Sequence, residues 1–203
     1  MQLEFWLDPA CPWCWLTSRW VNEVAPERDV DVVWRSISLK VKNDVQPGAS
    51  FHDTVVYTQG LLRVLEAVRA SEGNGPLGGL YTVYGEHIHH QQDCTVTASD
   101  LLAEAGIDTT YAAAFDDASW DAAIRSSMDD GLALTGNDVG TPILAFADDT
   151  GKRVGFFGPV ISRRLPKDQA LRLWDSLLLA ATVDGFWEMK RTRTESPDFT
   201  LPG

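Results

Sequence analysis

The chain has 203 residues, of which 44% are hydrophobic, so it can bury one substantial core without disulfide support. Its formal net charge of -12 at pH 7 repels phosphate backbones and anionic lipid, which disfavours nucleic acids and membrane surfaces as partners. The first residues lack the basic and apolar regions of a secretory signal, and no stretch approaches the ~20 apolar residues of a membrane span. We therefore expect a cytoplasmic protein.

Three elements of regular structure are predicted at the start of the chain. Residues 3–7 form a short apolar run that stops at Asp8-Pro9, as a buried strand does. Residues 13–25 have apolar side chains at helical spacing and are predicted to form a helix. Residues 29–38 have the β-branched content of a second strand. The predicted opening is therefore β-α-β.

The character of the sequence changes after the first fifty residues. Residues 50–138 are rich in Ala and Leu with helical periodicity, and we expect four or five helices there. Strand character returns at residues 143–146 and 154–157, with a turn at residues 149–151, which is typical of a hairpin. An amphipathic helix at about residues 171–181 then leads into a basic segment.

This order of elements divides the chain into two parts. Residues 1–49 and 139–203 combine β-α-β with β-β-α in one α/β domain, and residues 50–138 form an all-helical insertion between them. The sequence shows no internal repeat and no low-complexity stretch, and nothing in it indicates an oligomeric state.

A close pair of cysteines is the most specific chemical signal. Cys11-Pro12-Trp13-Cys14 lies between the first strand and the first helix, so the first sulfur falls at the helix N-terminus and the second one turn later. Free backbone N–H groups and the helix dipole stabilise an anion there, so we expect a depressed pKa for Cys11. Cys14 can then attack a mixed disulfide on Cys11. Cys11 is the predicted nucleophile, and Cys14 is the predicted resolving thiol.

A structural zinc site is the strongest alternative use of a Cys-x-x-Cys pair. Such a site needs four ligands, and the remaining soft candidates are His52, Cys94 and the histidine cluster at residues 87–90. We interpret the cluster as a solvated helix face and Cys94 as a thiol without a role. No bound metal is expected.

The loop Gly140-Thr141-Pro142 immediately precedes the third predicted strand. A proline that opens a strand after Gly-Thr is where a cis X-Pro bond would sit. In this order of elements the loop lies against the start of the Cys-x-x-Cys helix. There the backbone of Thr141 would pair with a substrate, and the loop would help to keep metals off the thiols.

The sequence resembles the DsbA-like branch of the thioredoxin superfamily. It shares Phe-x-x-Asp-Pro-x-Cys-Pro-Trp-Cys at residues 5–14, the long helical insertion, and Gly-Thr-Pro at residues 140–142. The resemblance is closer still to the actinobacterial mycothiol-dependent nitroreductases. Its most specific segments are Trp-Cys-Trp-x-Thr-Ser-Arg-Trp at residues 13–20 and Lys-Arg-Thr-Arg-Thr-Glu at residues 190–195, and further matching segments are residues 81–89, 138–142 and 156–163.

This resemblance implies a thioredoxin-like domain with an inserted helical subdomain. Electrons from the low-molecular-weight thiol mycothiol would reduce disulfides or small nitroaromatic compounds, with mycothiol as a co-substrate and no bound cofactor. Trp13 either offers a stacking face to an aromatic substrate or packs against the insertion. His89 would line the substrate cleft if its helix face turns toward the interior of the insertion. Arg19 and the basic residues 190–193 are interpreted as packing and capping groups.

Other functions stay open on the same residues. A protein disulfide oxidoreductase of the periplasmic kind is disfavoured, because no signal sequence is evident. A thiol-conjugating isomerase or transferase on the same fold would not need Cys14, so the intact pair argues against it. A zinc-stabilised binding module without catalysis is the third alternative.

Overall fold

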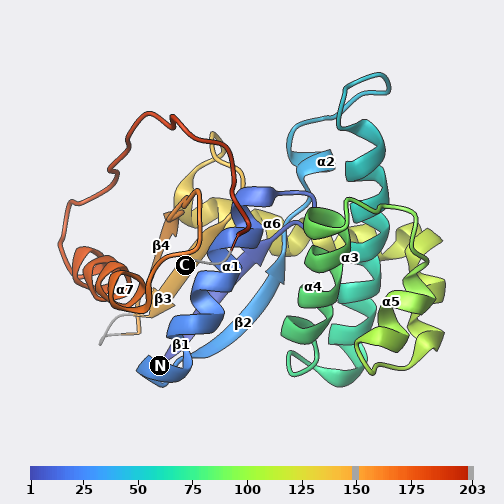
Figure 1. Cartoon of the computed structure of the whole chain (residues 1–203), viewed down its shortest axis with the longest axis horizontal. Coiled ribbons are helices and arrows are strands. Elements are labelled where there is room, and N and C mark those ends of the chain that lie inside the picture. Colours follow the sequence, from blue (N-terminus) through green and yellow to red (C-terminus); the bar gives the residue numbers. More distant parts are fainter. Residues whose placement is uncertain (148–150, 201–203) are drawn as a thin grey trace.

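The computed structural model describes residues 1–147 and 151–200, which form a sheet of four strands in the order β2-β1-β3-β4 (Figure 1). β1 (Gln2–Leu7) is parallel to β2 (Asp31–Ser36) and antiparallel to β3 (Ile143–Ala147). β3 is also antiparallel to β4 (Arg153–Phe157). α1 (Pro12–Val24) connects β1 to β2, since a parallel pair needs a crossover connection.

The observed order of elements is the predicted one. α1 covers residues 12–24 where the sequence predicts 13–25, whereas β2 is shorter at both ends than the predicted 29–38. β3 and β4 pair as the predicted hairpin. Of the predicted turn at 149–151, residues 149 and 150 lie outside the described residues. The α/β fold with a thioredoxin-like order of strands is confirmed.

The sheet is buried on both faces. Because side chains alternate along a strand, Phe5 of β1 belongs to the core beneath α1 and α7 (Lys167–Ala181), whereas Trp6 faces α6 (Asp121–Thr135). The core beside α6 consists of Trp6, Ile37, Met128, Leu132, Ile143 and Ala145. The sheet thus lies between the helical layer of α1 and α7 on one face and α6 on the other, and α1 begins directly after β1.

The insertion between β2 and β3 is helical, as predicted. Helices α3, α4 and α5 lie to one side of the sheet, and α6 packs against β2, β3 and β4 (Figure 1). α6 belongs to the predicted insertion but packs on the sheet of the other predicted part. The division of the chain into residues 1–49 with 139–203 and residues 50–138 therefore stays a prediction. In the described part of the chain, no helix is long and apolar enough to cross a membrane. The helical bounds are α2 (Leu39–Lys42), α3 (His52–Glu72), α4 (Leu77–Gly85) and α5 (Ala98–Glu104), a π-helical turn η2 (Glu86–His90), and the 3-10 turns η1 (Pro26–Arg28), η3 (Thr109–Asp116) and η4 (Ala118–Trp120).

After α7 the chain arches back, and the segment that leads to residue 200 returns to the side of α1 (Figure 1). We call residues 182–200 the tail. Contacts at its end include an ion pair between Arg163 and Glu195 and a hydrogen bond from the N–H of Asp198 to the carbonyl of Ser162 at 2.7 Å. Phe199 is half-buried near α1. The tail therefore contributes side chains to the region around the two cysteines.

Candidate active site

The two cysteines of the motif lie where α1 begins. Cys11 is the N-cap residue, and its Sγ accepts a hydrogen bond from the backbone N–H of Cys14 at 3.4 Å. Pro12 occupies the first helical position, where a missing N–H costs nothing. Both cysteines are free thiols, Cys11 being 8% exposed and Cys14 fully buried. The arrangement gives one thiol at the rim of the site and one directly behind it.

Thr141, in the loop before β3, contacts both sulfurs. The Thr141-Pro142 bond is cis, as the sequence predicts. The Cys11 thiol donates to the carbonyl of Thr141 at 3.6 Å. Thr141 Oγ1 donates to the carbonyl of Trp6 at 2.6 Å and lies 3.3 Å from Cys14 Sγ. The sequence predicts a role for the backbone of Thr141 alone, so the hydroxyl beside the second sulfur is a new finding.

Burial dominates the acid-base properties of both thiols. It raises the pKa of Cys11 to about 11, although the hydrogen bond from the Cys14 N–H lowers it. The pKa of Cys14 is also raised, first by burial and then by the neighbouring Cys11. The prediction of a depressed Cys11 pKa is therefore wrong for this structure. The helix N-terminus favours the thiolate, but the loss of water around the sulfur has the larger effect.

A buried carboxylate, Asp8, lies between β1 and the thiols. It is 1% exposed, and its two oxygens accept the backbone N–H groups of Ala10 at 2.8 Å and Leu39 at 2.6 Å. Burial nevertheless raises the pKa of Asp8 to about 6, and its charge raises the pKa of Cys11. No role was predicted for Asp8. The available signal was an acidic residue that ends an apolar strand three positions before a cysteine.

Asp8→Asn is expected to remove a pH dependence of stability. The pKa of Asp8 is about 6 in the folded chain against 3.8 for a free carboxyl, so the fold loses stability as the pH rises from about 4 through about 6. A shift of about two units corresponds to about 3 kcal/mol of unfolding free energy. Urea unfolding at about pH 4 and about pH 7 measures this difference, which should be smaller in Asp8→Asn than in the parent.

Asp129→Asn is the matched control, because Asp129 is exposed on α6 and should leave the pH dependence unchanged. Removal of the Asp8 charge should also shift the pH midpoint of Cys11 alkylation to a lower value, since Asp8 raises the pKa of Cys11. Equal losses of stability between the two pH values in Asp8→Asn and the parent would contradict the assignment.

Trp13 is covered by the tail. The indole is half-buried, and the guanidinium carbon of Arg193 lies 5.2 Å from the centroid of its ring. The positive charge of Arg193 also lowers the pKa of Cys11, as the smallest of five effects. The interpretation of residues 190–193 as packing groups agrees with this contact. The predicted open stacking face of Trp13 is occupied in this structure by Arg193.

The histidine cluster is not one solvated face, and that interpretation is wrong. His89 is buried, stacks on Trp15 with 5.9 Å between ring centroids, and donates from Nε2 to the carbonyl of Pro9 at 2.9 Å. Burial lowers the pKa of His89 to about 4, so its ring is neutral at pH 7. His87 contacts Glu104, and His90 is exposed. The cluster faces α1 on one side and solvent on the other.

Metal ligation receives no support from the arrangement. Within residues 1–147 and 151–200, no group of three or more His, Cys, Asp or Glu side chains could hold a metal ion. Cys94 is half-buried in the loop between η2 and α5. It lies outside the site that Cys11 and Cys14 define.

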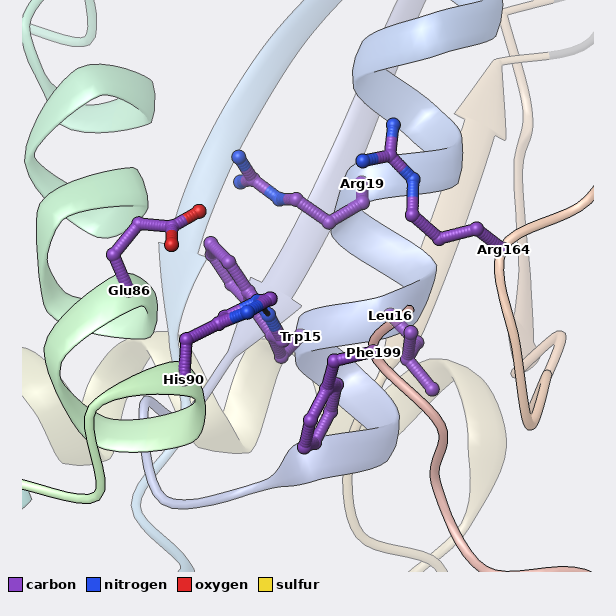
Figure 2. A pocket seen from close by; sticks show the side chains of 7 residues that line it. All are labelled: Trp15, Leu16, Arg19, Glu86, His90, Arg164 and Phe199. Atoms are coloured by element: carbon purple, nitrogen blue, oxygen red, sulfur yellow. Dashed lines mark hydrogen bonds between the residues drawn. The ribbon is translucent and has the colours of Figure 1, made fainter. Parts of the chain in front are cut away.

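A pocket of about 290 Å³ lies beside α1 and begins one helical turn beyond Cys11 (Figure 2). Trp15 marks that turn, because its N–H donates to the carbonyl of Cys11 at 3.0 Å. Of the two histidines His89 and His90, His90 lines the pocket. His89 does not line it and stacks on Trp15 instead. Four segments contribute to the lining, namely α1, η2, the loop before α7 and the tail, through Trp15, Leu16, Arg19, Glu86, His90, Arg164 and Phe199.

The fold is that of the DsbA-like oxidoreductases of the thioredoxin superfamily. A probable DsbA oxidoreductase of Streptomyces coelicolor, SCO1869, superimposes with a TM-score of 0.59 at 21% identity, over 100% of both chains. The cytosolic disulfide reductase DsbM of Pseudomonas aeruginosa gives a TM-score of 0.56 at 18% identity, over 88% of this chain and 99% of its own. These two structures define the class of fold.

The particular family follows from the sequence. Residues 10–191 match the family described as Rv2466c-like, mycothiol-dependent nitroreductase, and the chain belongs to it. An uncharacterized protein of Mycobacterium tuberculosis, Rv2286c, is 25% identical over 197 residues, which are 95% of this chain and 82% of that protein. The resemblance inferred from the motifs is confirmed. The family is described as one of mycothiol-dependent reductases.

Proposed function

We propose that the protein is a cytosolic thiol-disulfide oxidoreductase in which mycothiol regenerates the dithiol of Cys11 and Cys14. Its substrates would be disulfides and small nitroaromatic compounds. One observation carries the proposal: the Cys11 sulfur at the helix N-cap accepts the Cys14 N–H, with the Cys14 sulfur buried behind it. Residues 1–49 and 139–203 would form the thioredoxin-like domain, and residues 50–138 the inserted subdomain.

The reaction has two halves, namely oxidation of the dithiol by the substrate and reduction of the resulting disulfide by mycothiol. Each half consists of two thiol exchanges. The Cys11 thiolate attacks one sulfur of a substrate disulfide and expels the other sulfur as a thiolate. Cys14 loses its proton and attacks Cys11 Sγ, which releases the second substrate thiol and leaves a Cys11-Cys14 disulfide. One mycothiol then attacks Cys11 Sγ and frees Cys14, and a second mycothiol removes the first as mycothiol disulfide. The substrate gains two electrons and two protons, which two mycothiol molecules lose.

A nitro group can accept the same two electrons and two protons, giving a nitroso compound and water. The dithiol is oxidised to the Cys11-Cys14 disulfide in that case as well, and mycothiol restores it by the same exchanges. Both substrate classes therefore need the same two sulfurs. The two substrate classes differ in the first step, in which Cys11 attacks either a sulfur atom of the disulfide or the nitro compound.

Thr141 and Pro142 would support the exchange of Cys14. The Thr141 hydroxyl lies 3.3 Å from Cys14 Sγ and can donate to that sulfur when it becomes a thiolate. Without such a donor, a fully buried thiolate would be strongly disfavoured. Trp13 would form the wall of the site next to Cys11, after Arg193 moves from its ring.

Turnover with mycothiol as the sole reductant tests the proposal. We expect mycothiol-dependent consumption of a small disulfide and of a nitroaromatic compound, with slower turnover when glutathione replaces mycothiol. A thiol-conjugating isomerase or transferase needs a single sulfur, so it would keep full activity in Cys14→Ser. Absence of turnover with both substrates in the parent would reject the proposed function.

A further inference from the structure

The pocket beside α1 contains a buried positive charge. Arg19 Nη1 donates to Thr82 Oγ1 at 2.9 Å and its Nε donates to Ser18 Oγ at 3.3 Å, both neutral acceptors. Its Nη2 is buried and has no hydrogen-bond partner among the described residues. A buried charge is costly unless an opposite charge compensates it. The unpartnered Nη2 of Arg19 is therefore a position at which an anionic acceptor would be stabilised.

Arg164 adds a second free donor to the same pocket (Figure 2). Its Nη2 forms an ion pair with Glu23, whereas its buried Nε has no partner among the described residues. Burial is the largest cause that lowers the pKa of Arg19. The charge of Arg164 lowers this pKa further, so the two guanidinium groups lie near each other. The pKa of Arg19 is about 10, so its guanidinium is charged at pH 7. Planar carboxylates match guanidinium donors of this kind.

The remainder of the lining sets the orientation of a ligand. The guanidinium carbon of Arg19 lies 3.9 Å from the centroid of the Trp15 ring, so the charge rests on an aromatic surface. Phe199 and Leu16 add apolar surface nearer to the start of α1, as Figure 2 shows. The carboxylate of Glu86 points toward Arg19 and its charge raises the pKa of that guanidinium, so it compensates part of the positive charge (Figure 2). A ligand is thus favoured with its negative group at the arginines and its apolar part toward Phe199.

We propose that this pocket binds the carboxylate of a small aromatic substrate whose reducible group reaches Cys11. The inference rests on the proposed function and adds a class of substrate to it. Trp15 and Arg19 follow Cys11 by four and eight residues, which places their backbones about 6 and 12 Å from that of Cys11 along the helix axis. An aromatic ring that carries a carboxylate and a disulfide or nitro group fits that spacing. Arg19 and Arg164 determine specificity for the carboxylate.

Two aromatic disulfides that differ in charge test the proposal. In a Cys94→Ser background, which removes the more exposed free thiol, the reduced protein is mixed with 5,5'-dithiobis(2-nitrobenzoate), which carries carboxylates, or with 2,2'-dithiodipyridine, which is neutral. We expect Arg19→Gln and Arg164→Gln each to slow the first reaction about tenfold, the rate equivalent of about 1.4 kcal/mol. The rate with the neutral disulfide should stay at the parent value. Stopped-flow absorbance gives both second-order rate constants.

The controls separate local recognition from net charge and from misfolding. Arg125→Gln removes an exposed positive charge on α6 and should leave both rates unchanged. Arg19→Lys keeps the charge but loses the planar donors, and its rate with the carboxylated disulfide should fall between those of Arg19→Gln and the parent. Equal slowing of both disulfides, no slowing of either, or the same selective slowing in Arg125→Gln would overturn the carboxylate site.

A failure of the proposed function is visible separately. If neither disulfide reacts at Cys11 of the parent, the dithiol mechanism is rejected, and the site is then tested by equilibrium binding. Calorimetry should show that 4-nitrobenzoate binds more tightly than neutral 4-nitrobenzyl alcohol, and that Arg19→Gln abolishes the difference. Equal affinity of the parent for the two compounds would reject the carboxylate site on its own.

Discussion

Cys11→Ser is expected to lower mycothiol-dependent turnover on the order of a thousandfold or more, because Cys14, the other sulfur at the start of α1, is fully buried and cannot make the first attack. Cys14→Ser should behave differently. The mixed disulfide on Cys11 then lacks its internal resolving thiol and should accumulate as an adduct with mycothiol. Intact mass spectrometry should show the added mass on Cys11, and dithiothreitol should remove it.

The fate of the adduct also reports on the substrate. If free mycothiol resolves the adduct on Cys14→Ser, partial activity remains, which favours small disulfides or nitro compounds over protein substrates. Cys94→Ser is the control and should match the parent in turnover and in mass, because Cys94 lies outside the site. Activity in Cys11→Ser, or an adduct that maps to Cys94, would contradict the assigned roles of the cysteines.

Gly85→Ala is expected to be strongly destabilising. Gly85 is the last residue of α4, and a Cβ atom at this position would lie 2.1 Å from two ring atoms of Trp15. The indole has no room to retreat, because it is fully buried and Arg19 lies against its ring at 3.9 Å. We expect a loss of about 3 kcal/mol, at the upper end for an overpacked core. Thermal unfolding should show a fall in the melting temperature of roughly 10 °C.

Gly79→Ala makes the same chemical change six residues earlier in α4. Gly79 is exposed, and a Cβ atom there would have no neighbour within 4 Å. Alanine favours a helix over glycine, so this variant should be more stable than the parent by about 0.5–1 kcal/mol. Opposite signs for the two variants would show that contact with Trp15 causes the loss. A stable Gly85→Ala variant would contradict the close packing of α4 on α1.

The features that the sequence predicts correctly are carried by short stretches of chain. β1, the Cys-Pro-Trp-Cys motif and α1 follow one another directly, so hydrophobic period and position at a strand-to-helix junction are enough to place both sulfurs. The hairpin of β3 and β4 has the same local character. The Gly-Thr-Pro loop required one further step, namely knowledge of which strand lies beside β1.

Contacts between distant segments could not be predicted in this way. Cys11 and Thr141 are 130 positions apart, and the burial that raises the pKa of Cys11 depends on that approach. The position of Cys11 at a helix N-terminus, considered alone, predicts a lowered pKa. The pocket is assembled from residues of α1, His90 of the insertion, Arg164 of a loop and Phe199 of the tail. No local pattern relates these four segments.

The pocket has one wall of fixed length. Trp15 and Arg19 belong to α1, with Cys11 as its N-cap, so the helix rise sets the spacing of these three backbones along the helix axis. Glu86, His90 and Phe199 come from other segments and determine the width and the chemical character of the remaining space. Changes in the insertion or the tail would therefore alter which shapes the pocket admits. The backbone spacing along the wall that α1 provides would stay the same.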